Sequence, residues 1–157
     1  IQSRKAGIVA KNYHIIHSLD SYHLASKLER SLAEENKNIT AFLEVNVSGE
    51  ESKQGFQAWN EESWQTLAET IKPVLQLEHL QIQGLMTMPP FFEDAELSRP
   101  YFQKLARLRN YLLDVFPDND WFELSMGTSQ DYKVAIQEGA TYVRIGQAIL
   151  GERIKKR

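Results

Sequence analysis

The feature that most constrains the fold of this chain is a strict alternation of strand-like and helix-like hydrophobic patterns. Five short apolar runs predict strands at residues 13–19, 40–47, 80–86, 121–125 and 141–145. Between them, apolar residues recur every three or four positions, as on one face of a helix. This order is typical of an α/β fold whose parallel strands are joined by right-handed crossovers. A doubly wound sheet and a (β/α) barrel both fit it, and composition does not choose between them.

The predicted helices begin at polar residues that can accept a free backbone N–H group. Asp20 or Ser21 can cap the first helix, and Asn60 can cap the second. We expect Pro73 to kink or break this second helix, because proline lacks the N–H group that an inner helical turn needs. A third helix is predicted over residues 101–115 and a fourth over residues 129–138.

Length and composition favour one ordinary globular domain over residues 1–157. The chain is 42% apolar and 25% charged, and its formal net charge is −3, so it has no overall basic field to attract nucleic acid. It has no cysteine, which excludes disulfides and thiolate metal sites. The apolar runs are far shorter than the roughly 20 residues of a membrane helix. We therefore expect a cytoplasmic protein with no nucleic-acid or membrane partner.

Ligands of parallel α/β folds bind at the carboxyl ends of the strands, so the residues at and just after the end of each predicted strand are the candidates for a site. These residues are Asn46 and Ser48, Met86 to Pro89, Ser125 to Ser129, and Arg144 to Gln147.

Two neighbouring strand ends combine glycines with small hydroxylated residues. Gly127 lets the backbone approach a ligand, while Thr128 and Ser129 offer hydroxyl groups at the start of a helix. The next strand ends at Gly146, again before a short helical segment. This pairing favours a phosphate site. The alternative is that Thr128 and Asp131 form a capping box, which needs no ligand.

Arg144 is a permanent cation inside an apolar strand, so it must meet a partner or water. A ligand contact is favoured, and the alternative is an ion pair with Glu44 or Glu123. The segment "HSLD" from His17 to Asp20 suggests a catalytic triad, but adjacent positions on one strand cannot give the geometry of a triad. A solvated strand end is the better interpretation of these four residues.

Four segments together carry a family resemblance: "IQSRKAG", "FLEVNVSGEESKQGF", "IQGLMTMP" and "ELSMGTSQDYKVAIQEGATYVRIGQAILGER". In order and spacing they resemble the pyridoxal-phosphate homeostasis protein family, whose fold is like the N-terminal barrel domain of alanine racemase. The resemblance covers essentially the whole chain. It implies a (β/α) barrel that binds pyridoxal 5′-phosphate at the strand exits, in a carrier or regulator of vitamin B6 and amino-acid balance rather than a catalyst.

The resemblance also assigns roles to individual residues. Arg144 would face the pyridine nitrogen of the cofactor, and Met86 would pack near the ring. The cofactor phosphate would lie against two segments whose matching residues are Ser125, Met126, Gly127, Ser129, Gly146 and Gln147.

Several departures from the family pattern accompany these matches. Family members carry an N-terminal segment with the lysine that forms a Schiff base, and about three strands that this sequence does not contain. We therefore expect an N-terminally truncated barrel of about five parallel strands, in which only an unusual lysine such as Lys53 could bind the cofactor covalently. Arg4, Thr128 and Gln147 replace residues common in the family, which affects fine phosphate contacts.

Two other functions stay open at this point. An amino-acid racemase would need a lysine at the cofactor and a second acid/base group on the opposite face. A barrel binding another phosphorylated metabolite would need only the phosphate half of the site. The exposed edges of an incomplete barrel lead us to expect self-association or marginal stability.

Overall fold

Five parallel strands form one sheet in the order β1-β2-β4-β5-β6 in the computed structural model, which describes residues 1–151. Each strand is parallel to its neighbours, which confirms the predicted strand and helix alternation. A further strand, β3, has only two residues and pairs with the end of β2; it was not predicted. The strands are β1 (Ile15–Leu19), β2 (Ile39–Asn46), β3 (Phe56–Gln57), β4 (Leu80–Met86), β5 (Glu123–Thr128) and β6 (Tyr142–Arg144).

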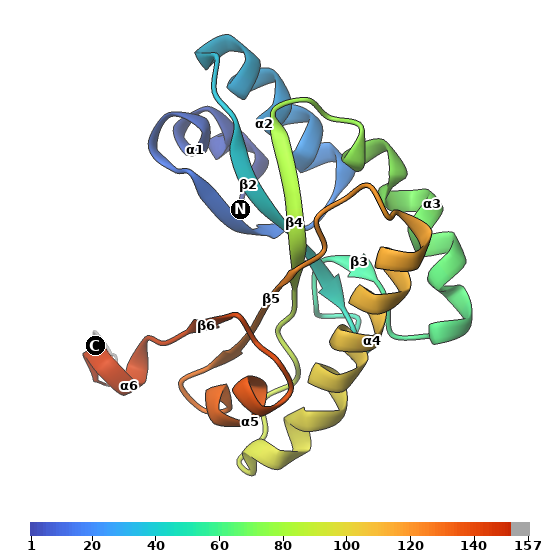
Figure 1. Ribbon diagram of the computed structural model, residues 1–157. Helices are drawn as coiled ribbons and strands as arrows, with labels where there is room; N and C mark the ends of the chain where they lie inside the picture. Colours follow the sequence, from blue (N-terminus) through green and yellow to red (C-terminus); the bar gives the residue numbers. More distant parts are fainter. Residues whose placement is uncertain (152–157) are drawn as a thin grey trace.

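The helices from α1 to α5 form an arc outside the sheet, each in contact with the next. Figure 1 shows α3 and α4 running along the same side of the sheet. None of the helices between residues 1 and 151 has both the length and the hydropathy that crossing a bilayer requires. The α-helices are α1 (Ala6–Asn12), α2 (Tyr22–Glu35), α3 (Trp64–Leu75), α4 (Arg99–Val115), α5 (Tyr132–Gln137) and α6 (Gln147–Leu150); short 3-10 turns are η1 (Ser3–Lys5), η2 (Glu61–Ser63) and η3 (Ala95–Ser98).

Most helices begin and end where the sequence predicts, with two corrections. Ser21 caps α2 by accepting the N–H group of Leu24, and Asn60 caps the turn before α3, as predicted. The predicted break at Pro73 is wrong in position, because α3 includes this residue and ends two residues later. A proline so near the end of a helix removes one hydrogen bond without disrupting the turns before it. The helix predicted over residues 129–138 begins only at Tyr132.

The main hydrophobic core lies between the sheet and the arc of helices. Most of the apolar positions predicted on α2, α3 and α4 are buried there, including Leu28, Ile71 and Leu108, which are fully shielded, whereas Val115 at the end of α4 is exposed. Burying a side chain of this size stabilises the fold by about 1.5–3 kcal/mol. The apolar sides of the helices therefore determine which face of the sheet the helices cover.

Contacts on the opposite face show that the sheet is strongly curled. His17 Nδ1 of β1 lies 2.8 Å from Ser125 Oγ of β5, although β2 and β4 separate these strands in the sheet. In a flat sheet such strands would lie roughly 14 Å apart. Between β4 and β5 the backbones also approach closely, since a Cβ atom at Gly84 would lie 2.0 Å from the carbonyl oxygen of Glu123. The fold is a curled half-barrel of parallel strands, so the barrel alternative is confirmed.

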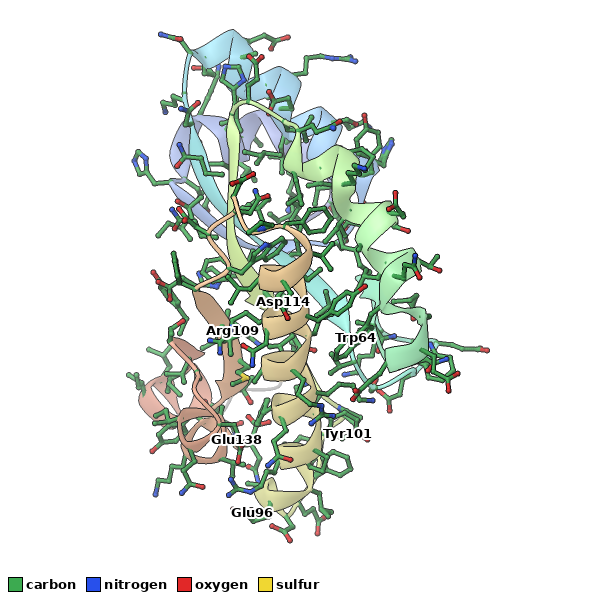
Figure 2. The ribbon with its side chains drawn as sticks, turned by 45° about the vertical axis from the view of Figure 1, so that its right-hand side comes forward. Trp64, Glu96, Tyr101, Arg109, Asp114 and Glu138 are labelled. Atoms are coloured by element: carbon green, nitrogen blue, oxygen red, sulfur yellow. The ribbon has the colours of Figure 1, made fainter. Side chains whose placement is uncertain are left out.

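An ionic cluster joins the beginning of α4 to the end of α5. Arg99 donates from Nε to Glu96 Oε2 over 2.7 Å, and its Nη1 atom donates to Glu138. Figure 2 shows Glu96 and Glu138 at the same end of α4. The hydrogen bond from Arg99 lowers the pKa of the Glu96 carboxyl group. This cluster ties the short helix α5, which follows the candidate site, to the longest helix of the fold.

Candidate functional site

An open hollow of about 650 Å³ lies at the carboxyl ends of β5 and β6. The residues around it include Phe91, Thr128, Ser129, Arg144, Gly146 and Gln147. Four of the eight residues that the sequence predicts for the cofactor are not on its lining, namely Met86, Ser125, Met126 and Gly127. The predicted residues thus fall into two groups. The outer group lines the hollow and consists of Ser129, Arg144, Gly146 and Gln147, and the inner group consists of the other four.

The outer group contains two backbone donors that converge on one oxygen atom. Ser129 Oγ accepts the N–H groups of Gly146 and Ala148, each over 3.1 Å. A Cβ atom at Gly146 would meet no other atom within 4 Å, so the backbone is open on that side. Converging N–H groups beside a hydroxyl group and an arginine can bind an anion oxygen. The donor set therefore fits a phosphate group.

The alternative of a capping box also holds in part, at Thr128, which precedes Ser129. Asp131 Oδ1 accepts both the N–H group of Thr128 over 2.7 Å and its hydroxyl group over 3.1 Å. Asp131 itself is buried. Thr128 is therefore engaged by the turn before α5, while Ser129 faces the turn before α6.

The structure explains why position 127 is a glycine, and the explanation differs from the predicted one. Its φ angle is +90°, and a Cβ atom there would lie 2.6 Å from the Cβ atom of Ala135. Such a φ and such a contact both favour glycine. The residue thus allows α5 to pack closely on β5, and the expectation that it opens the backbone to a ligand is not needed to explain it.

The inner group lies within the strands rather than after them, because β5 extends three residues beyond its predicted end. Ser125 is fully buried on the concave face of the sheet, where His17 contacts it. Met86 is buried outside the main core cluster, whereas Met126 belongs to that cluster. The side chain of Met126 therefore packs under the helices, and only its backbone is available to the strand exit.

Arg144 is held by two neutral acceptors. Its Nη1 atom donates to Ser125 Oγ over 2.7 Å, and its Nη2 atom donates to the carbonyl oxygen of Thr87 over 2.9 Å. Within residues 1–151, none of the ion pairs includes Arg144, so the alternative of a pair with Glu44 or Glu123 is wrong. Burial lowers the pKa of Arg144, while the charges of Asp131 and Glu44 raise it. Arginine stays protonated under such conditions, so a cation borders the hollow.

His17 belongs to the same network, and the prediction of a solvated strand end is wrong for it. Its ring stacks on Phe42 with centroids 4.4 Å apart and an interplanar angle of 6°. Tyr142 meets the same ring edge-on at 5.2 Å. Burial, and then the charge of Arg144, lower the pKa of His17. Sequence reasoning missed this contact because Ser125 lies 108 positions further along the chain.

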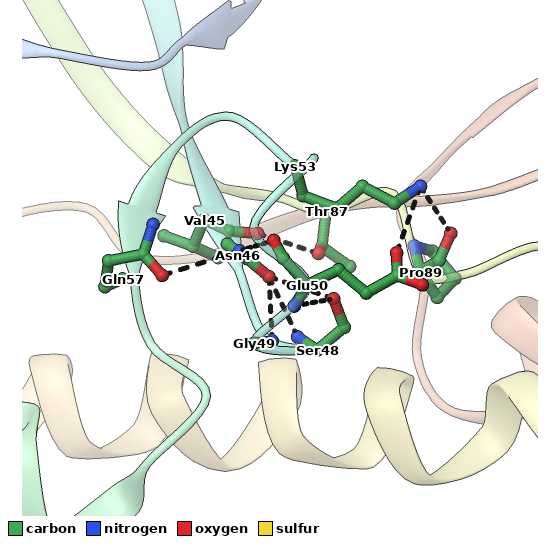
Figure 3. A network of polar contacts seen from close by, with 9 residues as sticks. All are labelled: Val45, Asn46, Ser48, Gly49, Glu50, Lys53, Gln57, Thr87 and Pro89. Carbon is green, nitrogen blue, oxygen red and sulfur yellow. Dashed lines mark hydrogen bonds and ion pairs between the residues drawn. The ribbon is translucent and has the colours of Figure 1, made fainter.

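The exit of β2 is occupied by its own hydrogen bonds, which Figure 3 shows. Asn46 Oδ1 accepts the N–H groups of Ser48 and Gly49 and the hydroxyl group of Ser48, over 3.0–3.1 Å. Asn46 Nδ2 donates to the carbonyl oxygen of Glu50 over 2.9 Å. Asn46 and Ser48 are candidates for ligand binding in the sequence, but their side chains form hydrogen bonds within a turn instead.

Lys53 extends from this turn toward the loop after β4. Its Nζ atom donates to the carbonyl oxygen of Pro89 over 3.3 Å and lies 3.9 Å from Glu50 Oε2. It borders a second hollow of about 150 Å³, which shares Phe91, Thr128 and Gln130 with the first. An amine therefore stands next to the candidate anion site.

Residues 1–151 contain no group of three or more His, Asp or Glu side chains that could hold a metal ion. The chemistry of the site is that of an amide, hydroxyl and guanidinium donor set.

Comparison with known proteins agrees with this geometry. The family model "Alanine racemase, N-terminal domain" matches residues 2–154. Pyridoxal phosphate homeostasis proteins of Aquifex aeolicus and Vibrio alginolyticus are each 40% identical over 153 residues, which is 98% of this chain. The chain spans 64% and 62% of the lengths of these two relatives.

A solved structure shows the same fold with a ligand in place. PipY of Synechococcus elongatus PCC7942 with PLP bound superposes with a TM-score of 0.83 at 29% sequence identity. The match covers 96% of this chain and 67% of PipY. The chain belongs to the alanine racemase N-terminal-domain family, among the pyridoxal phosphate homeostasis proteins.

Proposed function

We propose that this chain holds pyridoxal 5′-phosphate in the hollow at the ends of β5 and β6. The observation that carries the proposal is the convergence of the Gly146 and Ala148 N–H groups on Ser129 Oγ, next to the guanidinium group of Arg144. A phosphate group satisfies such donors at a strand exit. PipY, which superposes over most of this chain, has a structure with PLP bound.

In this proposal, residues of both groups are divided between the phosphate and the ring of the cofactor. Ser129, Gly146 and Gln147 surround the phosphate, and the backbone of Met126 and Gly127 shapes the same turn. Arg144 points its remaining N–H groups toward the pyridine nitrogen, with Ser125 behind it. Met86 lies on the concave side of the sheet, where it can pack near the ring.

We propose that the protein acts as a carrier or regulator rather than as a catalyst. When bound, the cofactor supplies an aldehyde that condenses with amines and a ring that withdraws electrons. Arg144 cannot release a proton to the ring nitrogen at neutral pH, because its guanidinium group stays charged. An unprotonated ring nitrogen withdraws electrons weakly, so this residue favours storage of the cofactor over carbanion chemistry.

The proposal is tested by titrating the purified chain with pyridoxal phosphate, followed by borohydride reduction and intact mass. Saturable binding that inorganic phosphate competes away supports the anion site. A reduced adduct that is lost in Lys53→Met would place a covalent attachment at the amine beside the hollow. Absence of saturable binding in the folded chain would contradict the proposal.

Two alternatives make different predictions. If the chain binds another phosphorylated metabolite, inorganic phosphate should raise the melting temperature while pyridoxal phosphate adds nothing beyond it. If the protein is a racemase, it should exchange the Cα hydrogen of an amino acid with solvent. Neither result is expected from a carrier.

We also propose that the chain self-associates through the outer strands of its sheet. β1 and β6 are the edges, and their side chains Ile15, Tyr142 and Val143 are 42%, 38% and 36% exposed. Exposed edges with apolar side chains can pair with another chain. Sedimentation should show a dimer that dissociates on dilution, and a monomer at all concentrations would contradict it.

A further inference from the structure

Ser125 Oγ sits between two partners that constrain where its proton lies. Arg144 Nη1 is 2.7 Å away on one side, and His17 Nδ1 is 2.8 Å away on the other. Arg144 can only donate, so Ser125 must accept from it. Of the hydrogen bonds of Ser125 Oγ within residues 1–151, only the one to His17 can then receive the hydroxyl proton. The opposite arrangement would bury that proton without an acceptor, because Ser125 is 0% exposed.

This assignment fixes the tautomer of His17. If Nδ1 accepts from Ser125, the proton of the neutral ring must be on Nε2. Burial, and then the charge of Arg144 on β6, lower the pKa of His17, which agrees with a neutral ring. Of the carboxyl groups in this region, Glu44 on β2 has its pKa raised, first by burial and then by Asp20.

The ring of His17 is also fixed in orientation. Phe42 of β2 stacks on one face, and Tyr142 of β6 meets it edge-on. His17 itself is on β1, an edge of the sheet, and its partner Ser125 is on β5, so the ring links two strands that β2 and β4 separate. The ring cannot leave its plane without losing the stack on Phe42, and within that plane the hydrogen bond to Ser125 decides which ring atom faces the serine.

We propose that His17 is a positioning residue, which holds the guanidinium group of Arg144 in place by accepting the hydroxyl proton of Ser125. With that proton directed to His17, the lone pairs of Ser125 are available to Arg144. Thr87 supplies the second acceptor from the end of β4, at 2.9 Å from Nη2. Two fixed acceptors determine the plane of the guanidinium group, and so the direction of the N–H groups that remain for a ligand.

The inference rests on the proposed function only for its effect on ligand binding, so its first test needs no ligand. Nitrogen-15 spectra of the chain at neutral pH should show His17 with a bare, hydrogen-bonded Nδ1 and a protonated Nε2. They should also show an ordered guanidinium signal for Arg144. A proton on Nδ1 of His17 would overturn the proposal without any variant being made.

Two variants distinguish the hydrogen-bonding role of His17 from the packing role of its ring. His17→Phe keeps an aromatic ring for Phe42 but removes the acceptor, whereas His17→Asn keeps an acceptor near the position of Nδ1 and loses the ring. The Arg144 signal should become averaged in His17→Phe and stay ordered in His17→Asn. The reverse pattern, or equal loss in both variants, would mean that the ring only packs.

Ligand binding provides the second readout. Pyridoxal phosphate affinity should fall about 3- to 10-fold in His17→Phe, as expected for one disturbed hydrogen bond, and recover to within about twofold in His17→Asn. Inorganic phosphate affinity should be unchanged, because the phosphate donors belong to other residues. In a Ser125→Ala background, His17→Phe should have no further effect.

The two proposals fail differently. If the parent chain binds neither pyridoxal phosphate nor phosphate, the proposed function fails, while the spectra still decide the role of His17. If the parent binds but His17→Phe binds equally well and keeps Arg144 ordered, the positioning role is wrong and the proposed function stands.

Discussion

Two exits of the same sheet carry similar polar residues and use them in opposite ways. After β2, the side chain of Asn46 is buried and makes five hydrogen bonds within its own turn and to Gln57. After β5 and β6, the N–H groups of Gly146 and Ala148 meet, among residues 1–151, only a serine hydroxyl group at the edge of an open hollow. The first exit is closed by its own contacts, and the second leaves donors that a ligand can reach.

The difference shows that polar residues at a strand end do not by themselves indicate a site. What distinguishes the second exit is that its donors are backbone groups of an exposed segment, with a cation beside them. A ligand that displaces Ser129 from these amides needs to break two hydrogen bonds on the surface. A ligand at the first exit would have to break a buried network.

The largest effect on stability is expected at the closed exit. Asn46→Ala leaves several buried donors and acceptors of the turn without partners, so the free energy of unfolding should fall by about 2–4 kcal/mol. Urea denaturation measures this, with phosphate affinity as the second readout. Phosphate affinity should not change in the folded variant.

Ser48→Ala is the matched control for that experiment. It removes the hydroxyl contacts to Asn46 Oδ1 and to the N–H group of Glu50 but keeps the other bonds of Asn46. A loss of about 1 kcal/mol or less is expected. Should Asn46→Ala be as mild as this control, the closed exit would not be the buried network described above.

Gly127→Ala is expected to cost about 2–3 kcal/mol, because it combines an unfavourable φ with a steric clash against Ala135. Gly139 is a control with a similar φ of +92° but no atom within 4 Å of a Cβ, so Gly139→Ala should cost only about 1 kcal/mol. Chemical denaturation of both variants separates strain from contact. Equal costs would mean that close packing of α5 does not explain Gly127.

The fold was largely predictable from the sequence, because its strands and helices are set by local periodicity. The five strands of the main sheet and the buried stripes of α2, α3 and α4 follow directly from that pattern. Helix α1 and the two-residue strand β3 were missed, since neither is long enough to give a clear period. The choice of a curled half-barrel came from the resemblance, because alternation alone is shared with doubly wound sheets.

The outer part of the candidate site was also predictable, for the same local reason. Ser129 and Gly146 stand out as small residues immediately around strand ends, and the structure brings them together. The place of His17 in the inner network was not predictable, because it lies 108 positions before Ser125 and two strands separate them in the sheet. Ser125 and Arg144 are on paired neighbouring strands, but only the curl of the sheet brings His17 to them, and no local pattern encodes that curl.

A smaller effect on stability is expected at the open exit. Ser129→Ala should change the free energy of unfolding by no more than about 0.5 kcal/mol, since it removes contacts to an exposed segment. Phosphate affinity should nevertheless fall about 3- to 10-fold, because one donor to the anion is lost. This is the reverse of the result for Asn46→Ala. A stable variant with unchanged phosphate affinity would break the comparison between the two exits.

The smallest expected effect is a dependence of stability on pH, which arises from His17 on the concave face of the sheet. Because the pKa of His17 is lowered in the fold, the unfolded chain takes up a proton first as the pH falls below 6.5. The stability that His17 contributes is therefore fully present above its ordinary pKa and is lost as the pH falls through its folded pKa.

Glu44 acts with the opposite sign and at lower pH. Burial raises its pKa above 4.5, so its ionised form disfavours folding at neutral pH, and this penalty is relieved as acid protonates it. Urea denaturation across this range should show the early loss in the parent and in Glu44→Gln but not in His17→Phe. An identical early loss in His17→Phe would assign it to other groups, and the neutral, hydrogen-bonded state of His17 would then have no part in holding the concave face together.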